Sequence, residues 1–220
     1  LNMNKKVAVI LSGCGVFDGA EIYEATLVQL RLDEAGVEYQ CMAPNVNQMH
    51  VLNHITGQEM QETRNVMVEA ARLCRGNIVD LAEANPNDYD AVIVPGGFGV
   101  AKNLSSFAVD GTDMTINADL VRFVQGIHKQ SKPVGLVCIA PALAPKLFGE
   151  GVACTLGSSE DDAAKAVMAM GANHVPCAVD EVCIDEERKL VTTPAYMLDI
   201  RISQAAVGIG KLVEAVLARA

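Results

Sequence analysis

Three short stretches of the chain hold residue types that could carry out covalent chemistry. They contain a cysteine, a glycine turn and two glutamates: Cys138 in GLVCIAPAL, PGGFG at 95–99, and Glu21 and Glu24 in GAEIYEA. Each stretch lies at or just after the end of an apolar run that is typical of a buried strand. Because ligands of open α/β sheets bind outside the carboxyl ends of the strands, we expect all three stretches at one site.

Cys138 is the sharpest of these candidates. It ends the apolar run over 132–138, and Pro141 suits the first turn of a helix that follows. A cysteine at such a strand-to-helix elbow lies near a helix N-terminus, which favours the thiolate and lowers the pKa of the thiol. The alternative is an ordinary buried thiol, because free cysteine is among the residues most often buried. The elbow resembles the G-x-S-x-G turn of hydrolases in logic but does not match its sequence.

The other two stretches supply possible partners for that thiol. Adjacent glycines in PGGFG turn backbone N–H groups toward the sheet edge, and together with the N–H of Ile139 they could stabilise an oxyanion. Glu21 and Glu24 are three apart on a predicted helix, so we expect one to point toward Cys138 while the other faces water. A carboxyl near a thiolate has a raised pKa and can move protons near neutral pH. The alternatives are a plain turn and solvated helix charges.

Two other patterns resemble cofactor or metal motifs but lack a residue that each motif requires. Gly13 and Gly15 have the GxG spacing of a dinucleotide fingerprint, but Asp18 stands where its third glycine belongs. His50 and His54 have i, i+4 spacing without the acid of an HExxH metal site. We therefore predict neither a nucleotide cofactor nor a metal. A third histidine, His174, precedes a strand-like segment and is interpreted as a hydrogen-bonded structural residue.

The elements that must position these residues alternate along the chain. Apolar runs predict strands, and helical spacing predicts helices between them. The predicted strands cover 5–13, 37–44, 89–99 and 132–138, with a short strand near Val152 and a hairpin-like pair at 179–184 and 189–193. The predicted helices cover 19–36, 62–74, 118–130, 141–147, 161–170 and 202–217. This order predicts an α/β fold, a mainly parallel sheet with helices on both faces, in a single domain over 1–220.

Composition excludes several classes of function. The chain has 220 residues, 50% of them hydrophobic, and a net charge of −10 with its 17 basic residues unclustered. These values argue against nucleic acid or an anionic membrane as a partner, and no apolar run reaches the length of a membrane span. Seven cysteines without a CxxC pair indicate neither a disulfide framework nor a zinc site. We expect reduced thiols and a cytoplasmic location.

Taken together, GAEIYEA, VIVPGGFG and VCIAPAL resemble the class I glutamine amidotransferase-like superfamily, in its PfpI and Parkinsonism-associated deglycase branch. SGCGVFDGAEIYEA, PGGFGVAKNLSSFA and VTTPAYM are similar to the enhancing-lycopene-biosynthesis family, also called sigma cross-reacting or isoprenoid-biosynthesis amidotransferase-like proteins. The resemblance spans nearly the whole chain. It implies a flavodoxin-like sandwich and a homodimer.

The resemblance also implies roles for individual residues. Cys138 matches the elbow nucleophile, and Glu24 matches the acid that contacts that thiol. Gly97 and Ile139 match the backbone donors of an oxyanion hole. Some relatives are cofactor-free glyoxalases or deglycases, so the implied substrate is a small aldehyde and no cofactor is implied.

One departure from the family pattern narrows the function. Glutaminases pair the elbow cysteine with a histidine, but Ile139 follows Cys138 here, and CTLGSSE has no histidine either. Amide hydrolysis needs a base and then an acid for the departing amine. The sequence therefore favours a glyoxalase or deglycase that converts glyoxal to glycolate through a cysteine hemithioacetal. Two alternatives remain: a redox sensor or stress-response binding protein, and a glutaminase subunit of a larger complex. Separately, the 45–87 segment is a candidate for lid or dimer contacts.

Overall fold

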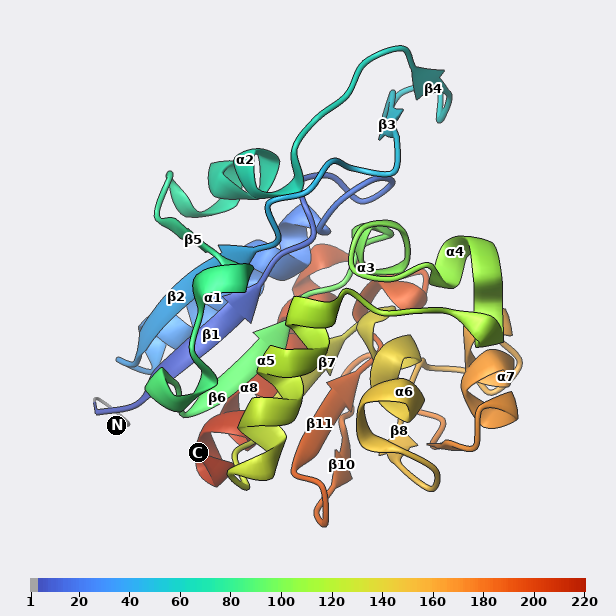
Figure 1. Cartoon of the computed structure of the whole chain (residues 1–220). Helices are drawn as coiled ribbons and strands as arrows, with labels where there is room; N and C mark the ends of the chain where they lie inside the picture. The colour runs from blue at the N-terminus through green and yellow to red at the C-terminus, as the bar shows by residue number, and fades with distance from the viewer. Residues whose placement is uncertain (1–3) are drawn as a thin grey trace.

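The computed structural model describes residues 4–220, and a seven-stranded sheet lies at its centre (Figure 1). The strand order is β10-β11-β7-β6-β1-β2-β5, and every pairing is parallel except that of β10 with β11. The strands are β1 (Lys6–Ile10), β2 (Glu38–Ala43), β5 (Ile78–Asp80), β6 (Ala91–Val94), β7 (Val134–Val137), β10 (Cys183–Asp185) and β11 (Leu190–Thr193). Two small pairs lie outside this sheet: β3 (Val51–Leu52) with β4 (Glu59–Met60), and β8 (Ala153–Cys154) with β9 (Asn173–His174).

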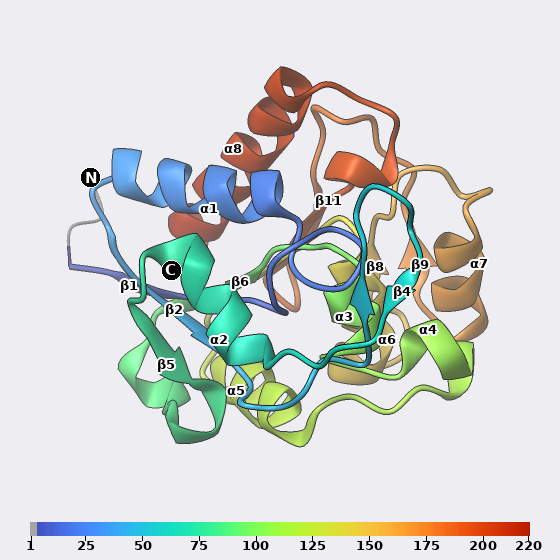
Figure 2. The ribbon, with the colours of Figure 1, turned by 90° about the horizontal axis from the view of Figure 1, so that it is seen from above.

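Helices cover both faces of the sheet (Figure 2). α1 (Ile22–Glu34) and α8 (Ile202–Arg219) lie on one face, and α5 (Ala118–Lys129) and α6 (Ala144–Phe148) lie on the other. The remaining helices are α2 (Val66–Ala70), α3 (Gly99–Lys102), α4 (Phe107–Asp110) and α7 (Asp162–Ala169). Six short 3-10 turns complete the list: η1 (Ala71–Cys74), η2 (Leu81–Glu83), η3 (Pro86–Asp88), η4 (Gly111–Asp113), η5 (Ala140–Leu143) and η6 (Ala195–Met197).

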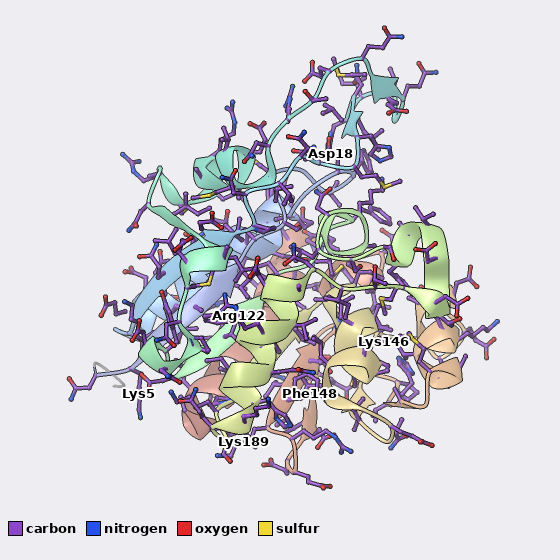
Figure 3. The ribbon with its side chains drawn as sticks, in the orientation of Figure 1. Lys5, Asp18, Arg122, Lys146, Phe148 and Lys189 are labelled. Atoms are coloured by element: carbon purple, nitrogen blue, oxygen red, sulfur yellow. The ribbon has the colours of Figure 1, made fainter. Side chains whose placement is uncertain are left out.

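The central strands are buried on both faces, which explains their unbroken apolar sequences. VAVI of β1, AVIV of β6 and VGLV of β7 are wholly buried, as expected where helices cover a parallel sheet on both sides. Gly135 of β7 lets α8 approach closely, because a Cβ there would lie only 3.0 Å from a methyl of Leu212. On the opposite face, Arg122 of α5 donates to the carbonyls of Leu81 and Ala84 (Figure 3).

The register of the sheet brings distant segments together at its carboxyl edge. Val94 of β6 pairs with Leu136 of β7, and Val137 pairs with Thr193 of β11. The three strands therefore end side by side, and the segments that follow them converge on one point. This is the edge at which the sequence placed the candidate site.

The flavodoxin-like α/β fold predicted from the sequence is confirmed, whereas several boundaries are wrong. The helix predicted over 62–74 begins only at Val66, after Asn65 caps it through a hydrogen bond from the Val68 N–H, and it ends as the 3-10 turn η1. The strand predicted over 179–184 begins at Cys183, because a turn closed by the Glu181 N–H and the Ala178 carbonyl precedes it. Within residues 4–220, no helix has the length and apolar character needed to cross a membrane.

Candidate active site

Cys138 occupies a sharp elbow directly after β7. Its φ is +62°, a left-handed conformation that is uncommon for residues other than glycine, and its N–H donates to the Thr193 carbonyl at 3.0 Å. The residue is buried, with 7% of its surface exposed. Strained backbone of this kind persists only where the surroundings hold it, and it concentrates at functional sites. The structure thus forms the predicted elbow and places the thiol at the sheet edge.

Glu24 is the closest ionisable partner of this thiol. The side chain is completely buried on α1 and hydrogen-bonds to Cys138. One carboxyl oxygen, Oε1, accepts the Gly96 N–H at 2.9 Å, and Oε2 accepts the Tyr196 N–H at 3.3 Å. Segments after β6 and β11 therefore orient the carboxyl against the segment after β7. Of the two glutamates singled out in the sequence, Glu24 is the one that points to Cys138.

Glu21 does not face water as the sequence suggested. It caps α1, since its Oε2 accepts the Glu24 N–H at 2.7 Å, and only 9% of the residue is exposed. Burial raises the pKa of the Glu21 carboxyl, while the backbone hydrogen bonds lower it. The prediction of a solvated helix charge is wrong because the capping role holds this carboxyl against the backbone.

Burial is the main cause that raises the pKa of Glu24 to about 8; the charge of Glu21 acts in the same direction, and hydrogen bonds to Cys138, Tyr196 and Gly96 oppose it. Glu24 is therefore mostly protonated at neutral pH. Burial also raises the pKa of the Cys138 thiol well above its usual range, and the neighbouring carboxylate adds to this. The expectation that this pKa is lowered is wrong in net direction, because burial outweighs the lowering effect of the backbone N–H groups that face the thiol.

Backbone N–H groups converge on the thiol from two segments. The N–H groups of Gly97 and Ile139 hydrogen-bond to the Cys138 side chain and lower its pKa against the larger effect of burial. Gly97 has a φ of +98°, and a Cβ there would collide with the Gly19 carbonyl. A Cβ at Gly96 would collide with the Cys138 side chain and with Oε1 of Glu24. The glycine turn is therefore required for the backbone to approach the thiol, and it supplies a donor where an oxyanion would form.

A cleft of about 850 Å³ opens over Cys138. Its walls come from loops and short helices rather than from the sheet, and most of the lining side chains are apolar. The lining residues are Val16, Phe17, Glu21, Leu52, Gly57, Gly97, Phe98, Ala101, Lys102, Phe107, Ala108, Gly111, Thr112, Cys138, Ile139, Asp161, Asp162, Ala163, Ala166, Tyr196 and Met197. The sequence analysis did not identify most of these residues, because they belong to turns without a recognisable motif.

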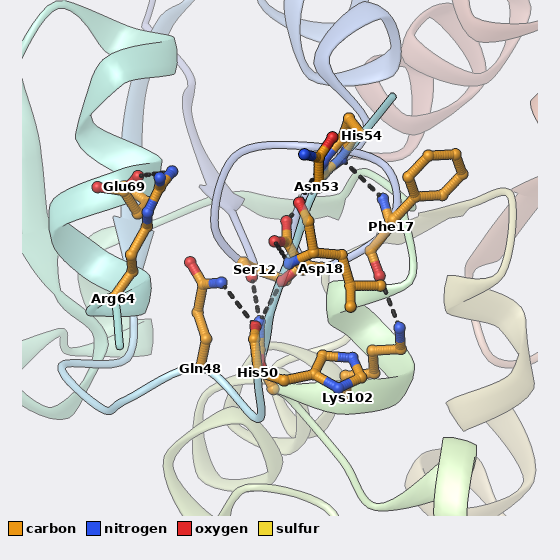
Figure 4. A network of polar contacts seen from close by, with 12 residues as sticks. Ser12, Phe17, Asp18, Gln48, His50, Asn53, His54, Arg64, Glu69 and Lys102 are labelled. Carbon is orange, nitrogen blue, oxygen red and sulfur yellow. Dashed lines mark hydrogen bonds and ion pairs between the residues drawn. The ribbon is translucent and has the colours of Figure 1, made fainter. Parts of the chain in front are cut away.

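A strap over residues 45–65, which contains the β3–β4 hairpin, contributes to one side of the cleft. Leu52 and Gly57 of the strap line it, and the lid or dimer role considered for residues 45–87 stays a prediction. The Leu52 N–H donates to Asp18 Oδ2 at 2.9 Å, and the Phe17 N–H donates to His54 Nε2 at 3.2 Å. Figure 4 shows these contacts around Phe17, whose carbonyl also accepts Lys102 Nζ at 2.7 Å.

The histidines of residues 4–220 lie outside the lining of the cleft. His174 is buried, accepts the Leu156 N–H at 2.8 Å and contacts the Ser159 hydroxyl at 3.0 Å, which matches its predicted structural role. Residues 4–220 also hold no group of histidine, cysteine and acidic side chains that could bind a metal ion.

Three comparisons relate this geometry to known proteins. The DJ-1/PfpI family model matches residues 5–197. The human "glutamine amidotransferase-like class 1 domain-containing protein 3, mitochondrial" is 45% identical over 221 residues, covering 96% of this chain and 82% of the human protein. The rat "ES1 protein homolog, mitochondrial" is 44% identical and covers 96% of this chain and 83% of its own length.

Solved structures of other proteins also superpose on this chain. An isoprenoid biosynthesis protein with an amidotransferase-like domain from Ehrlichia chaffeensis superposes with a TM-score of 0.91 at 33% identity, over 98% of this chain and 99% of that one. Glyoxalase III from Candida albicans superposes with a TM-score of 0.61 at 18% identity, over 97% and 98% of the two chains, and shows the shared fold. The resemblance predicted from the sequence is confirmed, and the chain belongs to the DJ-1/PfpI family.

Proposed function

We propose that this protein is a cofactor-independent enzyme that converts α-oxoaldehydes to hydroxy acids, with glyoxal to glycolate as the simplest case. The observation that carries the proposal is the pairing of Cys138, on its strained elbow, with the fully buried carboxyl of Glu24. A carboxyl with a pKa of about 8 can both give and take a proton near neutral pH, as aldehyde isomerisation requires.

The first step is addition of the thiol to one aldehyde carbon. The reactive form carries the Glu24 carboxylate, which is the minority form at neutral pH because the pKa is about 8. This carboxylate takes the thiol proton as the Cys138 sulfur bonds to carbon and passes the proton to the carbonyl oxygen, so the product is a hemithioacetal and Glu24 is again a carboxylate. The N–H groups of Gly97 and Ile139, which already face the sulfur, stabilise the negative charge that develops on that oxygen. In the resting site the high pKa of the thiol keeps it protonated, so ionisation accompanies attack on the substrate.

The second step moves a hydrogen between two carbons. The Glu24 carboxylate removes the proton from the carbon bonded to sulfur, giving an enediolate, and returns this proton to the neighbouring carbon. The hydroxyl proton of the first carbon passes to the oxygen of the second. The first carbon becomes a thioester carbonyl and the second a hydroxymethyl group, so one is oxidised as the other is reduced. Water then cleaves the thioester, which releases glycolate and restores the Cys138 thiol. The sum is glyoxal plus water to glycolic acid.

The direct test is conversion of glyoxal to glycolate by the purified protein, followed by proton NMR. Wild type is expected to accumulate glycolate, whereas Cys138→Ser and Glu24→Gln are not. Equal rates in all three proteins would overturn the proposal. Ammonia release from glutamine, measured in parallel, tests the glutaminase alternative, which lacks the expected histidine in this cleft.

The redox-sensor alternative receives less support from the same geometry. Peroxide oxidises the thiolate rather than the thiol, and the raised pKa of Cys138 disfavours its thiolate. Intact-mass spectrometry after mild peroxide treatment separates the two roles, because a sensor would oxidise selectively at Cys138 and show no turnover.

Two further predictions stay open to measurement. A homodimer remains our proposal for the assembly, and sedimentation of the purified protein tests it. For the location we retain the cytoplasm as a proposal, although the names of the human and rat relatives place those proteins in mitochondria. Fractionation of the source cells distinguishes the two compartments.

A further inference from the structure

The cleft over Cys138 is far larger than glyoxal. Its volume is about 850 Å³, near the upper end of the range of pockets that bury drug-sized ligands. If each CHO group of glyoxal is counted as one water volume of about 30 Å³, glyoxal fills roughly 60 Å³. A molecule that uses this cleft fully has many more atoms than glyoxal.

Apolar side chains from separate segments form the walls of the cleft. Phe17 follows β1, Phe98 precedes α3, Phe107 begins α4, Met197 ends η6 and Ala166 lies on α7. Phe98 remains 48% exposed although it lines a concave surface. Exposed apolar surface gathered in one concavity marks a binding site for an apolar group.

The charged residues at the rim are mostly tied to the protein itself. Lys102 donates to the Phe17 carbonyl and lies over the Phe98 ring. The carboxylates of Glu21 and Asp161 accept capping hydrogen bonds from the N–H groups of Glu24 and Ala163. These contacts leave the apolar walls as the main surface that the cleft offers to a ligand.

Building on the proposed function, we infer that the substrate is an α-oxoaldehyde whose ketone carbon carries an extended apolar substituent. Cys138, Gly97 and Ile139 line the same cleft as the aromatic residues, so a substrate whose aldehyde carbon is bonded to Cys138 must lay its substituent along those walls. The product is the corresponding long-chain 2-hydroxy acid, formed by the same hydrogen shift and thioester hydrolysis.

The experiment compares kcat/KM for methylglyoxal and 2-oxooctanal, which share the reacting group and differ by five methylenes. Burying one methylene raises kcat/KM roughly fourfold, so we expect about a 100-fold preference for 2-oxooctanal when only part of the chain is buried. Ala166→Trp, which fills the cleft from α7, should reduce this preference at least tenfold. Ala169→Trp is the matched control, because Ala169 lies on the same helix, is exposed and does not line the cleft.

Phe98→Ala provides a second variant that does not rely on adding volume. The Phe98 N–H donates to the Val16 carbonyl through the backbone, so the loop contact survives the substitution. We expect the preference for 2-oxooctanal to fall several-fold, with a smaller change for methylglyoxal.

The outcomes separate this inference from the proposed function. Turnover of methylglyoxal and 2-oxooctanal with equal kcat/KM would overturn the apolar substrate while the aldehyde chemistry stands. If neither aldehyde reacts, the proposed function fails, and calorimetry with 2-hydroxyoctanoate and lactate then decides the inference. Binding of 2-hydroxyoctanoate at least tenfold tighter than lactate, lost in Ala166→Trp but not in Ala169→Trp, would support an apolar ligand. Equal binding of the two acids would overturn it.

Discussion

The two sides of the cleft are built in different ways. At the thiol side, Cys138 and Glu24 are buried, and backbone groups that follow β6, β7 and β11 hold them. At the strap side, residues 51–60 include two strands of only two residues each, and Ile55 is 96% exposed. The sheet therefore holds the reacting groups in place, whereas loops with few buried contacts determine which substrates can reach them.

The strongest test of the thiol side is removal of the sulfur. Cys138→Ala should abolish aldehyde turnover, with a loss of at least roughly 10³-fold, because the nucleophile carries the covalent path. Cys177→Ser is a matched control, since Cys177 is a free, half-buried cysteine that does not line the cleft. Substantial turnover by Cys138→Ala, measured as acid product by NMR, would place the chemistry elsewhere.

The next largest effect is on stability and comes from Glu24. Its pKa rises from 4.5 in the unfolded chain to about 8 in the fold, so the folded protein binds the proton more tightly. The resulting stabilisation is fully present below pH 4.5 and is lost as the pH rises through 8. We expect the free energy of unfolding to fall by on the order of 4 kcal/mol between pH 5 and pH 9.

Urea unfolding of wild type and Glu24→Gln across this range measures the effect, because the neutral amide cannot ionise. The variant should show a much flatter pH dependence. The pH dependence that remains in the variant includes the contribution of Glu21, whose pKa is also raised by burial. The difference between the wild-type and variant curves of unfolding free energy against pH is therefore the contribution of Glu24. Parallel curves for the two proteins would show that the Glu24 pKa is not raised.

Turnover by Glu24→Gln is the third test of the thiol side. Loss of the proton carrier should reduce kcat/KM for an α-oxoaldehyde by roughly 10²-fold to 10³-fold. The variant should also lose the wild-type inflection near pH 8 that the pKa of Glu24 predicts. Glu21→Gln is the comparison: its amide oxygen can still accept the Glu24 N–H and cap α1, so the inflection should persist, moved to lower pH because a charge that raises the Glu24 pKa is removed. A pH profile unchanged in Glu24→Gln would remove Glu24 from the mechanism.

The sequence predicts the sheet and the thiol side of the cleft better than the loops that shape the rest of the cleft. Long apolar runs and clear helical spacing predicted β1, β6, β7, α1, α5 and α8, because burial between layers dictates those patterns. The elbow was predictable from the position of Cys138 at the end of such a run, with Pro141 after it. Glu24 was selected over Glu21 only by the family resemblance, since spacing on one helix does not reveal which residue faces the sheet edge.

The features that the sequence did not predict depend on tertiary structure. The pKa values of Cys138 and Glu24 follow from burial, which no local pattern encodes, so the predicted thiolate was wrong in direction. The cleft is assembled from single residues of separate turns, such as Phe98 and Phe107. The short edge strand β5 and the hairpin β3–β4 were not predicted, because two or three residues show no measurable alternation.

The smallest expected effect tests the strap. His54 accepts the Phe17 N–H, and its ring lies 4.7 Å from the Phe17 ring. His54→Ala removes both contacts at a partly exposed site, so the free energy of unfolding should fall by only about 1 kcal/mol. The strap lines the cleft, whereas the hydrogen bonds of Glu24 come from other segments. We therefore expect KM for 2-oxooctanal to rise about twofold to fivefold with kcat unchanged.

His128→Ala is the control for this change, since His128 lies on α5, away from the strap, and does not line the cleft. Limited proteolysis should cut His54→Ala faster than His128→Ala within residues 53–60, where fewer contacts then hold the strap. A loss of kcat in His54→Ala with unchanged KM would contradict the division, because it would mean that the strap helps to position the reacting groups as well as the substrate.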